Sequence, residues 1–275
     1  MERHYYDARL PGQSRLWIFG IGKKSRGSPL PENTAISIKN LKKIYRSPRF
    51  SRKKDVIAIE DLSLDIPKTG IFVLLGSNGQ VYHFFFGCIP FVHVTEVTYS
   101  AGKSTLLSTV AGISELSSGT VTFPGGTPRP ARGTLGIVPQ KNVLFPELTC
   151  LQTLQVWQAI KWSRKSIQKE DLHSLLTDCD LINKADECAG TLSGGQKRKL
   201  QLAIGIVGGS TSRLSSYLHI PRSYLHFPVV LVDECTSGVD PLSRRALWKT
   251  LTACREDRCI VFTTHVGILV NILEL

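Results

Sequence analysis

The order of apolar and polar positions along the chain predicts strands that alternate with helices. Short apolar runs and two-residue alternation predict strands, whereas apolar residues spaced by three or four positions predict helices. The expected strands cover residues 35–45, 56–66, 71–75, 120–123, 135–138, 229–232 and 259–263, and the expected helices cover residues 106–111, 147–162, 168–181, 195–207 and 242–255. This alternation favours an α/β fold with a mostly parallel sheet covered on both faces, and the first two strands suggest an antiparallel hairpin. Consecutive helices between about residues 145 and 208 indicate an inserted helical subdomain.

Two segments interrupt the pattern of elements, and we interpret both as insertions. Residues 80–100 carry six aromatic residues, and residues 211–228 contain the echo SYLHIP followed by SYLHFP, too few copies for a repeat architecture. Residues 1–34 are rich in Gly, Pro, Ser, Arg and Lys and show no sustained period, which predicts an extension or linker. We therefore expect one domain over residues 35–275 behind an N-terminal extension.

The composition disfavours a secreted, collagenous, fibrous or membrane-spanning protein. Of the 275 residues 42% are hydrophobic, which supports a sizeable core, yet no uncharged apolar run approaches the ~20 residues of a membrane helix. The N-terminus lacks the features of a secretory signal, and seven cysteines without a CxxC pair predict reduced cytosolic thiols that bind no metal.

The net charge of +12 is concentrated near the N-terminus. Residues 1–54 hold 14 of the 34 Lys and Arg residues and 3 of the 22 Asp and Glu residues, so the remaining body is nearly neutral. This basic arm could bind anionic lipid headgroups or nucleic acid, or it could be a solvated tail without a partner.

Two separated runs combine into a phosphate-binding motif. A Gly-rich turn follows the expected strand 71–75, and the first residues of a helix follow the aromatic segment; joined end to end they give GSNGAGKS, the P-loop pattern GxxxxGK[ST]. Backbone N–H groups of such a turn and of a helix N-terminus bind phosphate oxygens. We predict nucleotide contacts from Gly76, Ser77, Asn78, Gly79, Ala101, Gly102, Lys103, Ser104 and Thr105. Lys103 would reach the β- and γ-phosphates and Ser104 would ligate Mg²⁺.

Two further candidate sites follow along the chain: a pair of acids and a helix start that can bind an anion. The apolar strand 229–232 runs into Asp233 and Glu234, at the carboxyl edge where α/β sheets bind ligands. We predict that Asp233 holds Mg²⁺ through water and that Glu234 is the general base for an attacking water. Ser193, with the amides of Gly194 and Gly195, is expected to cap a helix and to bind a second anion.

The pentapeptide Leu192 to Gln196, LSGGQ, resembles the signature of the ATP-binding-cassette (ABC) ATPases, the nucleotide-binding domains of ABC transporters. The resemblance implies that Ser193, Gly194, Gly195 and Gln196 contact the nucleotide of a partner domain. It also implies an adenine-stacking role for Tyr45, a Mg²⁺ and water contact for Gln140, a loop crossing to the partner at Asp240, and a γ-phosphate contact for His265.

Longer runs resemble the A subfamily of these transporters, which are often associated with lipids: residues 142–149, 192–200, 208–210 and 236–248. The resemblance covers about residues 36–265 outside the two insertions. It implies an ATPase that uses ATP and Mg²⁺, works as one of two nucleotide-binding domains around two ATP molecules, and powers transport through transmembrane domains. The expected location is the cytoplasmic face of a membrane, reached through those partners, and no nucleic-acid partner is expected.

The sequence departs from the family pattern at several places. The P-loop is interrupted by residues 80–100, the link before the strand 229–232 is lengthened, and the segment after His265 lacks the acidic helix and closing strands of the family. Cys235 also stands where the family usually has proline. These breaks favour unremoved non-coding sequence and a truncated gene model, with genuine insertions as the alternative.

Because the interruption separates the two halves of the phosphate cradle, we expect the chain with this insertion to bind ATP weakly or not at all. Two other functions stay open from the sequence: a soluble ABC ATPase that acts on nucleic acid or ribosomes, and a non-catalytic ABC-like module.

Overall fold

The strands form two sheets. The computed structural model describes residues 30, 33–48, 54–75, 92–96, 102–130, 133–161, 171–208, 228–236, 238–256 and 258–264. The strands in these ranges are β1 (Thr34–Tyr45), β2 (Val56–Pro67), β3 (Gly70–Leu75), β4 (Val92–Glu96), β5 (Ser118–Thr122), β6 (Leu135–Val138), β7 (Val229–Asp233) and β8 (Cys259–Thr264). The helices are α1 (Gly102–Val110), α2 (Cys150–Lys161), α3 (Leu172–Asp178), α4 (Gly194–Ile206) and α6 (Pro241–Ala253), with short 3₁₀ turns η1 (Ile182–Lys184) and η2 (Ala189–Thr191).

The five-stranded sheet has the order β4-β3-β8-β7-β6 with parallel pairing throughout, and the three-stranded sheet has the order β2-β1-β5 with antiparallel pairing. In the larger sheet β8 lies between β3 and β7, with Leu74 opposite Thr263 and Asp233 opposite Thr263 on the other side. The carboxyl ends of β3, β8 and β7 therefore meet at one edge of the sheet.

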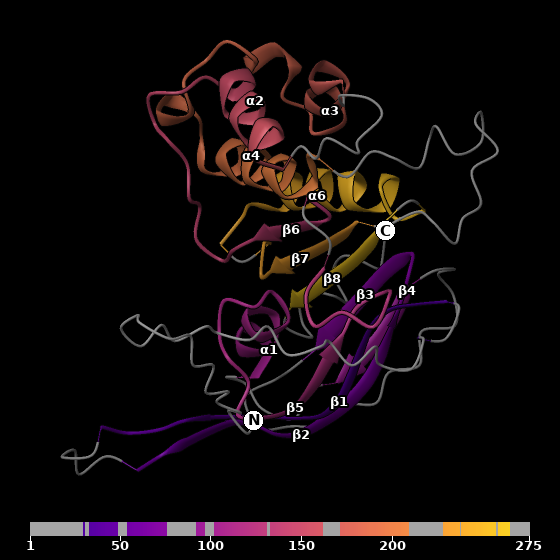
Figure 1. Cartoon of the computed structure of the whole chain (residues 1–275). Helices are drawn as coiled ribbons and strands as arrows, with labels where there is room; N and C mark the ends of the chain where they lie inside the picture. Colours follow the sequence, from indigo (N-terminus) through magenta and orange to yellow (C-terminus); the bar gives the residue numbers. More distant parts are fainter. Residues whose placement is uncertain are drawn as a thin grey trace, which may run out of the picture.

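Alternating side chains of the central strands divide the core into two halves. Val230 and Val232 of β7 pack on the side of the helices α2, α3, α4 and α6, whereas Val229 and Leu231 pack with α1 and the antiparallel sheet. Strands β3 and β8 alternate in the same way. Helix α1 thus lies between the two sheets, and the other helices cover the opposite face of the parallel sheet (Figure 1). Double coverage explains why these strands are almost continuously apolar.

Most of the elements expected from the sequence are confirmed, with shifted ends. Helix α1 starts at residue 102 rather than 106, because its first turn is the small and polar sequence GKST, which has no apolar spacing. The helix expected over residues 168–181 is shorter: α3 starts after Asp171, whose side chain accepts from the His173 N–H and caps it.

The structure adds one strand that the sequence pattern did not predict. Residues 92–96, inside the expected insertion 80–100, form β4 and pair in parallel with β3 from Ile71–Val92 to Leu75–Glu96. The rest of that insertion, most of the expected insertion 211–228 and the N-terminal extension lie outside the described residues. The domain boundaries stay predictions.

Gly136 of β6 and Gly205 of α4 allow the signature-bearing helix to approach the sheet closely. A Cβ atom at Gly136 would lie only 1.8 Å from the backbone oxygen of Gly205. We expect Gly136→Ala to lower the free energy of unfolding by about 1–3 kcal/mol, because backbone must move to admit the methyl group. Urea denaturation measures this, with Gly194→Ala as control, since a Cβ atom there meets nothing within 4 Å. Equal losses in the two variants would contradict the close packing.

Candidate functional site

A lysine at the start of α1 is buried beside two carboxylates. Lys103 is 1% exposed, on a helix whose first residue, Gly102, is also buried, while Ser104 is exposed. Burial lowers the pKa of the Lys103 ammonium, and the nearby carboxylates of Glu234 and Asp233 partly offset this by raising it. The structure therefore brings together the predicted phosphate-binding lysine and the two predicted acids.

The two acids are fixed by the neighbouring strand β8. The Thr263 hydroxyl donates to Asp233 Oδ1 at 2.7 Å, and the Glu234 N–H donates to Thr263 Oγ1 at 3.0 Å. One buried hydroxyl thus orients the Asp233 carboxylate and holds the backbone of the next residue. Sequence analysis missed Thr263. The available signal was a hydroxyl residue near the carboxyl end of an apolar strand, the edge where α/β sheets bind ligands.

Gln140 contacts the predicted general base directly. Its side-chain Nε2 donates to Glu234 Oε2 at 2.9 Å, across 94 positions of sequence. Glu234 itself has a φ of +44°, a left-handed backbone conformation that non-glycine residues rarely adopt. The carboxylate is therefore held by a specific contact and carried by a strained backbone.

Arg198 of α4 links the segments that carry Gln140 and Glu234, and the sequence analysis did not assign it a role. Its guanidinium donates to the carbonyl oxygens of Pro139 at 2.7 Å, Asp233 at 3.1 Å and Cys235 at 2.8 Å, and to Asn142 Oδ1 at 3.2 Å. Burial lowers the pKa of Arg198, while Cys235 and Asp233 raise it to a smaller extent. Within the run Lys197-Arg198-Lys199 nothing local distinguishes this arginine from a solvent-facing charge.

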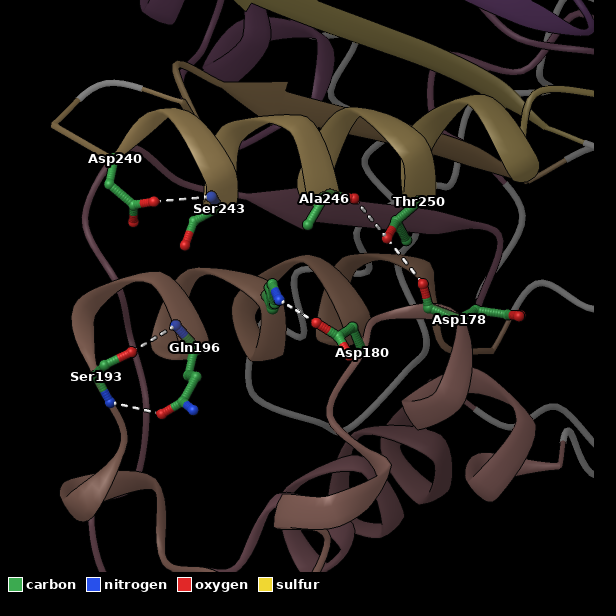
Figure 2. A network of polar contacts seen from close by, with 9 residues as sticks. Asp178, Asp180, Ser193, Gln196, Asp240, Ser243, Ala246 and Thr250 are labelled. Atoms are coloured by element: carbon green, nitrogen blue, oxygen red, sulfur yellow. Dashed lines mark hydrogen bonds and ion pairs between the residues drawn. The ribbon is translucent and has the colours of Figure 1, made fainter.

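The predicted second anion site is built as a capped helix start. Ser193 accepts from the Gln196 N–H at 3.3 Å, and the Gln196 side chain accepts from the Ser193 N–H at 2.9 Å, which completes a capping box (Figure 2). Such a cap is worth about 1 kcal/mol of helix stability. Ser193 and Gly194 are exposed.

The starts of α4 and α6 lie side by side (Figure 2). Asp240 caps α6 by accepting from the Ser243 N–H at 2.9 Å, which lowers the pKa of its carboxyl. A Cβ atom on Gly195 would lie 2.4 Å from Ser243 Oγ and 3.5 Å from Asp240 Oδ2. The structure therefore places the signature residues and the predicted crossing loop on one surface.

Tyr45 ends β1 and is 45% exposed. Its hydroxyl lies 3.4 Å from Thr105 Oγ1 of α1, and the Lys43 ammonium lies 4.9 Å from the ring centroid. The structure thus places this partly exposed tyrosine beside α1, the helix that begins with the predicted phosphate-binding residues.

Several predicted site residues lie outside the described residues: Gly76, Ser77, Asn78, Gly79, Ala101 and His265. The described residues that flank two of these gaps, Leu75 and Thr264, lie at one end of the parallel sheet. Leu75, before the Gly-rich turn, pairs with Thr264, before His265, and also with Glu96 of β4. All three positions therefore lie at the same edge of the sheet as Asp233.

The donor set at this edge fits a hard divalent cation. Mg²⁺ prefers oxygen ligands from one or two carboxylates together with hydroxyls, water and phosphate. Asp233 and the exposed Ser104 supply such oxygens, with the Gln140 amide carbonyl as a further donor. Among the described residues no group of three or more His, Cys, Asp or Glu side chains is placed to hold a metal ion.

Comparison with known proteins shows which family the chain resembles. A model of the ABC transporter family matches residues 100–212. The chain is 32% identical over 239 residues to ABC transporter A family member 4 of Dictyostelium discoideum, covering 85% of this chain and 12% of that protein. It is 35% identical over 293 residues to ATP-binding cassette sub-family A member 7 of Rattus norvegicus, covering 95% of this chain and 11% of that protein. The chain thus spans only 11% to 12% of the length of these relatives.

Solved structures share the fold. A dimeric bacterial ABC transporter cassette aligns with a TM-score of 0.58 and 20% identity over 86% of this chain and 90% of that one. A dimeric post-hydrolysis state of a cassette bound to ADP and Pi aligns with a TM-score of 0.58 and 19% identity, with the same coverage. The fold is therefore that of an ABC ATPase cassette. In the described ranges no helix has the length and apolar character needed to cross a membrane.

Cys235, directly after the predicted base, gives a pH-dependent test of the packing around the site. Complete burial raises the pKa of its thiol from 9.0 to about 12, so the folded state keeps a proton that the unfolded state releases. Stability from this group is therefore lost as the pH rises from 9 towards 12, by up to about 1.4 kcal/mol per pH unit.

We expect Cys235→Ala to flatten the fall of the unfolding free energy between pH 9 and 11, measured by urea denaturation at each pH. Cys259→Ala should do the same, because burial raises the pKa of that thiol to about 12 as well. A slope as steep as that of the unaltered chain in both variants would contradict the buried placement of these thiols.

Proposed function

The chain carries an ABC ATPase domain of the kind found in A-subfamily transporters, and we propose that it binds and hydrolyses ATP to power transport across a membrane. The observation that supports this best is the buried Lys103 beside Asp233 and Glu234. A cation at a helix start next to two acids at a sheet edge suits the polyphosphate of a nucleotide and its metal ion.

Each residue at this edge has a distinct part in the proposed reaction. Lys103, the amides at the start of α1 and the Gly-rich turn at residues 76–79 bind the β- and γ-phosphates, and Tyr45 stacks on the adenine. Ser104, Asp233 and Gln140 would hold Mg²⁺, which would neutralise the phosphate charge. His265 would contact the γ-phosphate.

Glu234 is the proposed general base. It accepts a proton from the attacking water, whose oxygen forms a bond to the γ-phosphorus while the bond to the β,γ-bridging oxygen breaks, giving ADP and phosphate. Gln140, which already donates to Glu234 Oε2, holds that carboxylate in place and contacts the water. Thr263 and the backbone around it keep the acid at the edge of the sheet.

The proposal includes a second nucleotide-binding domain. Ser193, Gly194, Gly195 and Gln196 form a capped helix start beside Asp240, with Ser193 and Gly194 exposed. We therefore assign this surface to the nucleotide held by the partner cassette.

The proposal also includes transmembrane domains that bind at the cytoplasmic face of a membrane, with a lipid as the proposed cargo. Val143 and Phe145, shortly after Gln140, are 62% and 53% exposed. The Val143 N–H donates to Gln201 Oε1 of α4 at 2.7 Å, so this apolar surface is tied to the signature helix. An apolar contact there would connect a membrane partner to Gln140.

A second candidate is a non-catalytic cassette, favoured by the interruption of the P-loop at residues 80–100. In that case the two acids and the signature would be present without a continuous phosphate cradle.

Retention of labelled ATP by the purified chain in the presence of Mg²⁺ tests the function. We expect Lys103→Ala to weaken retention by about tenfold or more, because a buried cation at the phosphates is lost. Glu234→Gln should retain ATP but lower turnover by about a hundredfold. Lys184→Ala is the control, since Lys184 forms an exposed ion pair with Glu187 within three residues. If the unaltered chain and Lys103→Ala bind ATP equally, the proposal fails.

Deletion of residues 80–100 tests the effect of the interruption. Joining Gly79 to Ala101 makes the P-loop continuous, so we expect tighter ATP binding than in the full chain. The deletion also removes β4, so thermal unfolding must accompany the binding titration. An unchanged affinity in a folded deletion variant would show that the interruption does not limit binding.

A further inference from the structure

Arg198 is a buried cation whose hydrogen-bond acceptors all belong to the segments carrying Gln140 and Glu234. The residue is 3% exposed, and its guanidinium donates to three backbone carbonyls and one side-chain amide oxygen. A buried arginine is retained most readily where its planar, multi-donor head holds several groups at fixed positions. The residues that accept from Arg198 indicate which groups it holds in position.

Two of those acceptors bracket Glu234. The Arg198 Nε donates to the carbonyl oxygen of Cys235 and an Nη donates to that of Asp233, the residues on either side of the proposed base. Glu234 has a φ of +44°. A non-glycine residue keeps such a conformation only where its surroundings fix it. The Arg198 contacts on both sides, together with the Glu234 N–H contact to Thr263, supply that constraint.

The other two acceptors belong to the segment of Gln140. The remaining Nη of Arg198 donates to the carbonyl oxygen of Pro139, directly before Gln140, and to Asn142 Oδ1, two residues after it. One guanidinium therefore fixes the backbone next to both members of the Gln140–Glu234 pair. A lysine ammonium has no rigid fork and cannot hold the same set of directions.

We propose that Arg198 is the positioning residue of the hydrolytic pair: it holds Glu234 and Gln140 in their relative register and ties that register to the signature helix α4. Its guanidinium contacts the two segments that carry the pair, and it acts through them. The inference rests on the proposed ATPase function for its kinetic consequence, whereas the geometry it describes can be tested without turnover.

Steady-state hydrolysis by the full chain tests the kinetic consequence. We expect Arg198→Met to lower kcat by about tenfold to a hundredfold while the KM for ATP changes by less than about threefold, because chemistry and not phosphate binding is misaligned. Arg198→Lys should also stay well below the unaltered kcat, because charge without the fork does not bracket Glu234. A kcat equal to that of the unaltered chain in either folded variant overturns the proposal.

Arg258, directly before β8, offers a matched control that contacts the same helix. It is also buried, and one of its Nη atoms donates to the carbonyl oxygen of Ile206 at the other end of α4. Arg258→Met removes a buried guanidinium whose described acceptor, Ile206 O, belongs to α4 and not to the segments of Gln140 and Glu234. We expect it to lower thermal stability while kcat stays near that of the unaltered chain; a matching loss of kcat would show that Arg198 acts through stability alone.

Thiol labelling followed by mass spectrometry tests the geometry independently of turnover. Cys235, bonded to Arg198 through its carbonyl, and Cys259, beside Arg258, are 0% and 1% exposed. We expect Arg198→Met to speed N-ethylmaleimide labelling of Cys235 by about tenfold relative to Cys259, through local opening, and Arg258→Met to favour Cys259.

Labelling also separates the two ways of failing. If the unaltered chain shows no hydrolysis, the proposed function fails, and selective labelling of Cys235 in Arg198→Met still supports the positioning role. Equal acceleration of both cysteines, or none, overturns that role whether or not the chain hydrolyses ATP.

Discussion

The parallel register of β3, β8 and β7 is the constraint on which the site depends. Because these strands end together, Asp233 at the end of β7 and Glu234 directly after it lie at the same sheet edge as the end of β3, and Lys103 of α1 is buried beside them. A lone buried ammonium would be costly, and the carboxylates of Asp233 and Glu234 reduce that cost without removing it, since the pKa of Lys103 stays lowered. With Arg198 counted, two cations face two acids. A nucleotide polyphosphate entering this nearly balanced cluster would bring excess negative charge, which is a physical reason for a divalent cation to accompany it.

The central sheet could be predicted from sequence because its strands are buried on both faces. Residues 135–138 and 229–232 are short apolar runs bounded by turns, and such runs have few other stable arrangements in a chain of this size. The paired acids after β7 and the capped start of α4 were also visible, because strand ends and Ser caps are local signals. In each case the physical cause lies within a few residues of the feature that it produces.

The features that sequence did not reveal depend on contacts between distant segments. Strand β4 has an ordinary alternating sequence, and only its pairing with β3 gives it a place. The aromatic residues around it pointed to an insertion and hid the strand. Arg198 lies between two lysines, and its neighbours in space come from segments more than 30 positions away along the chain. The left-handed conformation of Glu234 has no sequence signal, because glutamate rarely adopts it without support from its surroundings.

Helix α4 connects the signature residues with the Gln140–Glu234 pair, and it makes contacts at its end, in its body and at its start. Its C-terminal carbonyls accept from Lys161, with bonds of 2.7 Å to Ile204 O and 3.0 Å to Val207 O, an arrangement that also suits the helix dipole. Its middle holds the site through Arg198, and its start presents Ser193 to solvent. Ser193 and Arg198 therefore lie on one continuous helix, at its capped start and within its body. The same element that would meet a partner's nucleotide therefore also sets the geometry of the chain's own acid and amide pair.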